Sequence, residues 1–179
     1  MGKISVLRLE VDDERQPFDC GDPDLNEFFE IDSRKSSLEL LSVTYVVQKE
    51  GHLVAFFSVS NDSLKREEVG REPLKRATHR MPKQKRYKSL PAVKVGRFAV
   101  AKEEQSCGLG RRILDFIKAW FTVGNKTGCR FIIVDAYKKS TGFYLRNGFS
   151  FLSEKDKDDE TRLMYFDLIL AINKDDVPA

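Results

Sequence analysis

The 179-residue sequence is poor in the residues that build metal centres and disulfide frameworks. It contains three cysteines and two histidines, and no CxxC pair. Because Cys20, Cys107 and Cys129 are odd in number and far apart, they favour a reducing cytoplasm over a set of disulfides. A structural zinc site uses four Cys or His ligands at close spacing, so none is expected, and no other metal site is predicted.

Long apolar runs are also missing. No stretch approaches the roughly 20 apolar residues that a membrane-spanning helix needs. The opening MGKISVLRLEV lacks the apolar core and cleavage site of a signal peptide. The 31 basic and 28 acidic residues nearly cancel, so the overall charge of +3 points to no class of partner. With 41% hydrophobic residues, the chain is expected to form one globular domain over residues 1–179.

Hydrophobic periodicity predicts strands and helices in alternation. Ile4–Leu9 suits a first strand, and Asp22 followed by Pro23 is a typical helix start. β-branched residues on either side of Glu50-Gly51 predict a hairpin. The other expected elements are a helix at 33–41, a buried strand at 131–136, a short helix at 141–145 and two last strands at 149–152 and 162–168. This order is typical of a mixed α/β or α+β fold.

A basic stretch at about 61–90 interrupts the alternation. From Leu74 onward it contains no acidic residue, and the next acid is Glu103. One interpretation is a solvated loop or insertion, since charge runs usually lie on a solvated face. The other is a contact surface for a polyanion, on which Tyr87 is available to stack. Both interpretations stay open. The tail at about 172–179 is expected to fray.

A glycine pair lies where a strand, a polar connection and a helix follow one another. The strand ends at Val100, and apolar residues spaced by three and four from Leu109 onward define one helix face. Gly108 and Gly110 therefore lie at the helix start, where backbone N–H groups lack intrahelical partners. The helix dipole favours an anion such as a phosphate at this position.

Two common phosphate motifs do not fit. A dinucleotide fingerprint would have a third glycine at Ile113 and would place its turn directly after the strand. A P-loop would have Lys followed by Ser or Thr in place of Arg111-Arg112.

The longer pattern resembles the GNAT acetyltransferase superfamily. Gln105-Ser106-Cys107-Gly108-Leu109-Gly110 is similar to its pyrophosphate loop, Q/R-x-x-G-x-G/A, and residues 142–149 are similar to its FY-x-x-x-GF signature. The resemblance covers residues 91–168. It implies a GNAT-like domain, with a mixed central sheet of six to seven strands and about four helices, and acetyl-CoA as co-substrate. The residues implied to bind acetyl-CoA are Phe98, Ala99, Val100, Gln105, Ser106, Cys107, Gly108, Leu109, Gly110 and Arg111.

Other segments resemble the tRNA-acetylating toxin branch of this superfamily. They are Phe18-Asp19-Cys20-Gly21-Asp22, Leu90-Pro91, Arg97-x-Ala-Val and Val134-Asp135-Ala136. The chain departs from that branch at 106–107 and 141–142. The resemblance implies transfer to the α-amine of aminoacyl-tRNA, with a cognate antitoxin as a further partner; an exposed strand or helix edge would allow a homodimer. The residues expected to contact substrate or tRNA are Lys83, Lys85, Arg86, Lys88 and Arg97.

The sequence offers one candidate general acid for acetyl transfer and no strong general base. Tyr144 is the candidate proton donor to the CoA sulfur, and a buried core tyrosine is the alternative interpretation. A backbone N–H near Phe98–Val100 would polarise the thioester carbonyl. No acid or histidine interrupts Val93–Val100. Deprotonating a lysine at pH 7 costs about 4.6 kcal/mol, whereas an α-amine costs about 1 kcal/mol, so an α-amine fits better. Glu103 or Glu104 acting through water is the weaker option, and Cys107 is expected only to pack in the loop.

Three functions remain open at this level. The favoured one is acetyl transfer to aminoacyl-tRNA. The second is acetyl transfer to a small amine or a protein N-terminus. The third is a non-catalytic member of the superfamily that binds acetyl-CoA or RNA.

Overall fold

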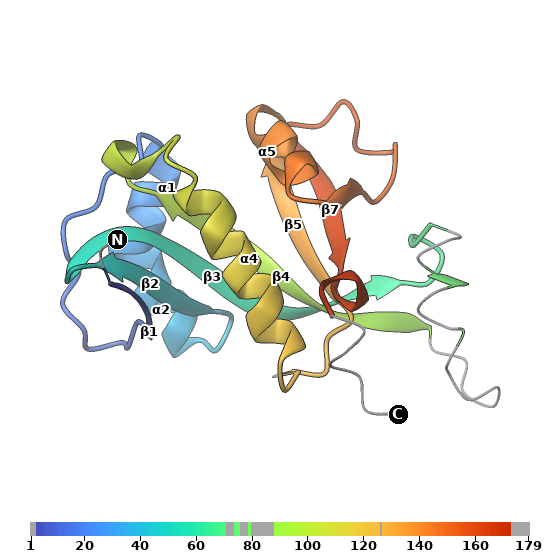
Figure 1. Ribbon diagram of the computed structural model, residues 1–179, viewed down its shortest axis with the longest axis horizontal. Coiled ribbons are helices and arrows are strands. Elements are labelled where there is room, and N and C mark those ends of the chain that lie inside the picture. Colours follow the sequence, from blue (N-terminus) through green and yellow to red (C-terminus); the bar gives the residue numbers. More distant parts are fainter. Residues whose placement is uncertain (1–2, 71–73, 76–78, 80–87, 126, 173–179) are drawn as a thin grey trace. The chain divides into compact units, whose positions relative to one another are not determined.

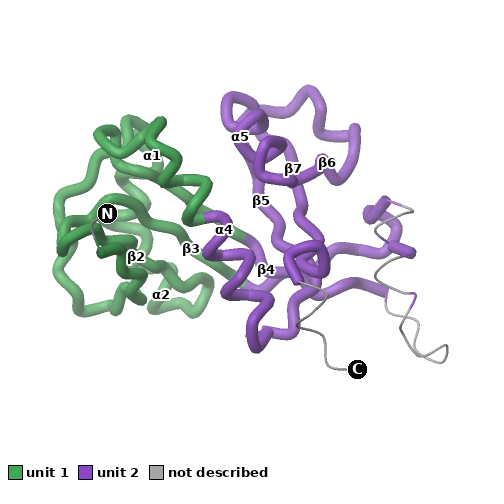
Figure 2. The backbone as a smooth tube through the Cα atoms, viewed as in Figure 1, with its two compact units in different colours: residues 1–60, 95–113 green, residues 61–94, 114–179 purple. Residues whose placement is uncertain are grey.

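A computed structural model describes residues 3–70, 74–75, 79, 88–125 and 127–172. Seven strands form one mixed sheet in the order β1-β2-β3-β4-β5-β7-β6 (Figure 1). The predicted strand number and fold class are therefore confirmed. The chain divides into two compact units, residues 1–60 with 95–113 and residues 61–94 with 114–179 (Figure 2). Each is described in turn; the prediction of a single domain stays a prediction.

Unit 1 begins with three antiparallel strands. β1 (Ile4–Arg8) pairs with β2 (Val43–Lys49). β2 pairs with β3 (His52–Lys65), as the hairpin pattern predicted. The turn uses Glu50 at φ 54° and Gly51 at φ 85°. Glycine adopts this left-handed conformation without steric penalty, which explains the position of Gly51 in the sequence.

The helical segment of unit 1 is continuous, where two separate helices were expected. α1 (Pro23–Glu27) passes into a π-helical turn, η1 (Phe28–Asp32), and then into α2 (Ser33–Leu38). The π turn buries the consecutive residues Phe28 and Phe29. Both belong to an apolar cluster that unites the helical segment with three strands and comprises Leu9, Phe28, Phe29, Val46, Phe56 and Ala99. Phe56 is at its centre, because its ring lies 5.0 Å from that of Phe29 and 6.1 Å from that of Phe28.

The predicted strand–connection–helix sequence is present. β4 (Ser89–Val100) is followed by a 3-10 turn, η2 (Lys102–Glu104), and by α4 (Leu109–Thr122). Three residues of the predicted apolar face, Leu109, Ile113 and Ile117, are at most 5% exposed, but Phe116 of that face is 39% exposed. The helix buries Leu114 and Phe121 in addition. The helix therefore begins where the glycine pair predicted.

In unit 2, the strands extend further into the basic stretch than the sequence predicted. β3 continues to Lys65 and β4 begins at Ser89, so the connection is shorter than 61–90 at both ends. The physical reason is apolar burial: Leu64 and Leu90 are each 1% exposed and pack in one cluster with Phe131 and Ile133. Because Leu64 and Leu90 stand among charged residues, the sequence pattern did not predict that they are buried.

The rest of unit 2 matches the predicted order. β5 (Phe131–Tyr137) leads through η3 (Lys138–Ser140) to α5 (Thr141–Arg146), then β6 (Ser150–Phe151), β7 (Thr161–Asp167) and η4 (Leu168–Ala171). β7 pairs antiparallel with both β5 and β6. An ion pair precedes β5: Nε of Arg130 lies 2.7 Å from Oδ1 of Asp167, whose side chain is 1% exposed.

The described residues contain no helix with both the length and the apolar character of a membrane span. Nor do they contain a group of three or more His, Cys, Asp or Glu side chains able to hold a metal ion. The expected frayed tail lies outside the described residues, apart from Ile172.

Candidate functional site

The glycine turn of unit 1 has a left-handed backbone at two positions and is strained at the one that is not glycine. Ser106 has φ 63° and Gly108 has φ 78°. A left-handed conformation costs an ordinary residue about 1–2 kcal/mol, so Ser106 is held in place by its surroundings. The first α-helical hydrogen bond of α4 runs from Arg112 N–H to the carbonyl of Gly108, at 3.2 Å. The N–H groups of the preceding turn therefore project at the helix start without an acceptor inside the helix.

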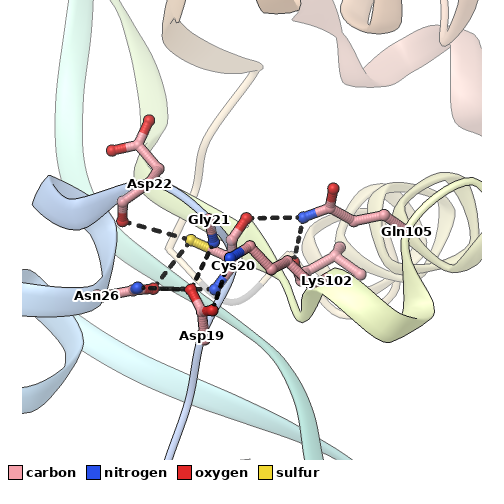
Figure 3. A network of polar contacts seen from close by, with 8 residues as sticks. Asp19, Cys20, Gly21, Asp22, Asn26, Lys102 and Gln105 are labelled. Atoms are coloured by element: carbon pink, nitrogen blue, oxygen red, sulfur yellow. Dashed lines mark hydrogen bonds and ion pairs between the residues drawn. The ribbon is translucent and has the colours of Figure 1, made fainter.

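Gln105 fastens this turn to two other backbone segments. Its side-chain amide donates to the carbonyl of Cys20 at 2.8 Å and to the carbonyl of Val100 at 2.9 Å (Figure 3). A primary amide has two N–H donors, so both are used. The side chain of Gln105 therefore acts within the protein, and the expected ligand contacts of this loop fall to its backbone N–H groups.

The shape of the turn suits a phosphate group. A Cβ atom placed on Gly108 would have nothing within 4 Å, so the backbone there borders open space. Ser106, Cys107 and Arg111 are exposed beside it, whereas Leu109 is buried and anchors the helix. Open space, a glycine backbone and a helix N-terminus together make a cradle for an anion.

Of the two carboxylates on the 3-10 turn, Glu104 is already committed to an ion pair. Glu104 lies 2.7 Å from Nζ of Lys49 and is 24% exposed, so it is already paired with a cation. The pairing raises the pKa of Lys49 through a hydrogen bond and the charge of Glu104. Glu103 is exposed on the same 3-10 turn. No acidic residue or histidine occurs anywhere in β4, from Ser89 to Val100.

Asp135 is a further carboxylate that is already committed. It lies on β5 in unit 2 and forms an ion pair with Lys94 of β4. This explains the Val134-Asp135-Ala136 segment at least partly as a cross-strand charge pair.

Tyr144 lies on α5 in unit 2, among aromatic rings. It is 8% exposed, and its ring makes edge contacts with Phe143 at 5.2 Å and Phe149 at 5.4 Å. Burial raises the pKa of its hydroxyl above the ordinary value. The group is therefore neutral at pH 7 and carries a proton to donate, but it is a weaker acid than the sequence alone predicted.

The candidate substrate residues are only partly described. Lys83, Lys85 and Arg86 lie outside the described residues, as does Tyr87. Lys88 is exposed directly before β4. Arg97 is exposed on β4 in unit 1, and its guanidinium carbon lies 5.2 Å from the centre of the Phe28 ring.

Sequence reasoning missed the roles of Asp19, Asn26 and Lys102. Asp19 accepts hydrogen bonds from Asn26 Nδ2 at 2.9 Å and from Lys102 Nζ at 2.8 Å. These contacts lower the pKa of Asp19 from 3.8 to about 2, with Lys102 the largest cause. The available signal was the Phe18–Asp22 segment, which resembled the toxin branch but had been given no role.

Comparisons with solved structures identify this fold. The chain is similar to a bacterial toxin at 16% identity, covering 96% of this chain and 94% of the other, with a TM-score of 0.76. It is similar to AtaT complexed with acetyl-methionyl-tRNAfMet at 20% identity, with 94% and 96% coverage and a TM-score of 0.75. A tyrosine-to-phenylalanine mutant of KacT gives the same identity, coverage and TM-score. Comparison with curated protein sequences gave no match.

The family profile described as "Acetyltransferase (GNAT) domain" matches residues 41–151, which is more than half of the chain. The matched region includes β4, the glycine turn and α4, the same elements that carried the motif resemblance. The chain therefore belongs to the GNAT acetyltransferase family.

Proposed function

We propose that this protein transfers an acetyl group from acetyl-CoA to the α-amine of aminoacyl-tRNA. The observation that carries the acetyl-CoA half is the open cradle at Gly108, at the N-terminus of α4. Bound acetyl-CoA would supply the acetyl group as an activated thioester. The N–H groups from Ser106 to Gly110, with Arg111 beside them, would hold its pyrophosphate through charge-assisted hydrogen bonds.

Two groups of this chain would serve the transfer itself. A backbone N–H at the end of β4, between Phe98 and Val100, would stabilise negative charge that develops on the carbonyl oxygen. Tyr144 would donate its proton to the departing sulfur. Because burial raises the pKa of Tyr144, donation to a thiolate is unfavourable unless the acceptor lies in direct hydrogen-bond contact.

The choice of an α-amine as the acetyl acceptor rests on the absence of a general-base side chain from β4. Its residues include no carboxylate or imidazole, and Glu104 and Asp135 are paired with lysines. Glu103, exposed on the 3-10 turn, could act through water, but an amine substrate would find no strong base in β4 itself. An α-amine has a pKa of about 7.7–8.0, within reach of neutral pH, whereas a lysine amine at about 10.4 is not.

The nucleic-acid part of the proposal rests on charge and on similarity. The sequence places Lys83, Lys85, Arg86 and Lys88 within six residues, and Arg97 is exposed on β4. AtaT, which shares the fold, has been solved with acetyl-methionyl-tRNAfMet and with the C-terminus of its antitoxin AtaR. A cognate antitoxin and a homodimer are accordingly proposed as assemblies of this chain, and the cytoplasm as its location.

The decisive experiment supplies every charged tRNA at once. The protein is incubated with total aminoacyl-tRNA and acetyl-CoA labelled in the acetyl group, and the label is followed into the aminoacyl fraction. Label in N-acetylaminoacyl-tRNA is the expected result. No label there, with acetyl-CoA binding intact, would refute the acceptor and leave the cofactor proposal standing.

Salt dependence tests the basic residues. Changing Lys83, Lys85, Arg86 and Lys88 to glutamine should weaken tRNA binding and flatten its dependence on salt, since fewer phosphate contacts release fewer counterions. An unchanged kcat/KM and salt slope would favour a small amine or a protein N-terminus as acceptor.

A further inference from the structure

A hydrogen-bond network around Asp19 connects to the glycine turn through Cys20 and Gln105. The proposed acetyl transfer does not use the side chains of this network. All of its members lie in unit 1 (Figure 3). One carboxylate oxygen of Asp19 accepts from Gly21 N–H at 2.8 Å and from Asn26 Nδ2 at 2.9 Å. The other accepts from Lys102 Nζ at 2.8 Å. Lys102 is also bonded to Asp19 through the backbone, at 3.0 Å.

These contacts fix the orientation of one peptide group. The N–H of Gly21 and the carbonyl of Cys20 belong to the same trans peptide, so they point in opposite directions. When Asp19 holds the N–H, the carbonyl is directed toward Gln105, which donates to it at 2.8 Å. Asn26 Oδ1 accepts from Cys20 N–H at 3.0 Å and fixes the preceding peptide as well.

The backbone conformation at Gly21 and the position of Lys102 beside it both require glycine. Its φ is +83°, and a Cβ there would lie 2.8 Å from Cε of Lys102. Glycine therefore allows both the left-handed turn and the close approach of the lysine.

Stability alone does not explain the arrangement. The side chains of Asp19 and Lys102 are 56% and 60% exposed, and ion pairs this exposed contribute little to folding. The consequence of the network is geometric instead. It gives Gln105 a fixed acceptor at Cys20 in addition to Val100, and Gln105 directly precedes the strained residue Ser106.

We propose that Asp19 and Asn26 are positioning residues that hold the glycine turn, through the Cys20 carbonyl and Gln105, in the conformation that receives the pyrophosphate of acetyl-CoA. The inference rests on the proposed function for the identity of the ligand. It goes beyond that function by assigning a role to the Phe18–Asp22 segment. Neither residue touches the ligand; both act on the turn.

The test compares two ligands that differ in the pyrophosphate. Acetyl-CoA carries it, and S-acetylpantetheine lacks it together with the adenosine. Calorimetric titration of the full chain measures both dissociation constants for wild type, Asp19→Ala and Asp19→Asn. Asp19→Ala should weaken acetyl-CoA about tenfold and S-acetylpantetheine less than about twofold, because only the pyrophosphate contacts are disturbed. Asp19→Asn keeps an oxygen for Gly21 N–H and should restore part of the loss.

Asp32→Ala is the matched control. Asp32 forms a similar exposed ion pair in the same unit, 3.1 Å from Lys35, and it does not contact the network members around Asp19. It should leave both affinities unchanged. Equal losses for the two ligands, or no loss of acetyl-CoA affinity in Asp19→Ala, would overturn the proposal. The failure of the acceptor proposal is separate, because it would show in the tRNA assay while wild type still binds acetyl-CoA.

Discussion

Substitution of Gly108 by alanine tests the cofactor proposal, because a second glycine of the same unit serves as a control for the backbone strain that alanine introduces. Gly108 has φ +78°, and a Cβ there would meet nothing within 4 Å. Gly51, in the β2–β3 hairpin of the same unit, has φ +85° and equally open surroundings. Alanine at either position therefore introduces the same left-handed strain without a clash, and only one of the two borders the proposed ligand.

The expected magnitudes separate the two effects. Each substitution should lower the free energy of unfolding by about 1–2 kcal/mol, which is the penalty of a left-handed non-glycine residue. For a chain of this length that corresponds to roughly 2–8 °C in Tm. In Gly108→Ala the backbone N–H remains, but the added Cβ occupies the open space where the pyrophosphate would approach and should cost at least one charge-assisted hydrogen bond, about 1.5–3 kcal/mol. That loss equals roughly a 10- to 150-fold increase in Kd for acetyl-CoA.

Two measurements on each variant decide the matter. Thermal unfolding without ligand measures the strain, and calorimetric titration with acetyl-CoA measures the binding. We expect matched Tm losses and a weakened Kd in Gly108→Ala only. If Gly108→Ala binds acetyl-CoA as tightly as Gly51→Ala does, then the pyrophosphate does not approach this backbone and the cradle has been assigned wrongly.

Further predictions concern the proposed proton donor, a buried ion pair and acid sensitivity. Tyr144→Phe should reduce kcat strongly while the Kd for acetyl-CoA stays near wild type, as rapid-quench kinetics and titration would show; an unchanged kcat would leave Tyr144 as a core residue. Arg130→Met should lower the free energy of unfolding in urea by about 3–5 kcal/mol, because the buried carboxylate of Asp167 loses its cationic partner. Adding Asp167→Asn should recover part of this loss, and no recovery would show that lost packing dominates. The pKa of Asp19 falls from 3.8 to about 2 on folding, so its ionised form contributes a small stabilisation above about pH 4, limited by the exposure of its ion pair with Lys102, that disappears as the pH drops toward 2. The Tm difference between wild type and Asp19→Asn should shrink over that range, and a constant difference would contradict this titration.

The parts of the fold that the sequence predicted are those with a repeating hydrophobic pattern. The face of α4 repeats every three to four residues, and Glu50-Gly51 marks the β2–β3 turn, so these elements fell close to their predicted positions. The ends of β3 and β4 did not. Leu64 and Leu90 are single buried residues among polar neighbours, and a single apolar residue defines no period.

The backbone elements of the candidate site could be predicted from motifs, but the contacts that support its turn could not. The turn from Gln105 to Gly110 combines a strand end with a helix start, and both have local sequence signals. The bond from Gln105 to the Cys20 carbonyl joins residues 85 positions apart and depends only on the direction of one peptide. A hydrogen bond from a side chain to a distant backbone group produces no periodic pattern in the sequence, so the partner of Gln105 can be identified only from the structure. The raised pKa of Tyr144 depends likewise on rings that surround it in the fold.

The π-helical turn at Phe28–Asp32 determines how the side chains of α1 are rotated about the helix axis relative to those of α2. Each residue of an α-helix advances the chain by about 100°, and a π turn accommodates one residue more than an α turn does. Deleting one residue here would restore α-helical winding and rotate Asn26 relative to Ser33, whose hydroxyl bonds to the Phe29 carbonyl. We expect this rotation to break the hydrogen bond that Asn26 accepts from Cys20 N–H. The length of this segment is therefore a constraint on the proposed acetyl-CoA site, and a chain without the extra residue would need another means of orienting the Cys20 carbonyl.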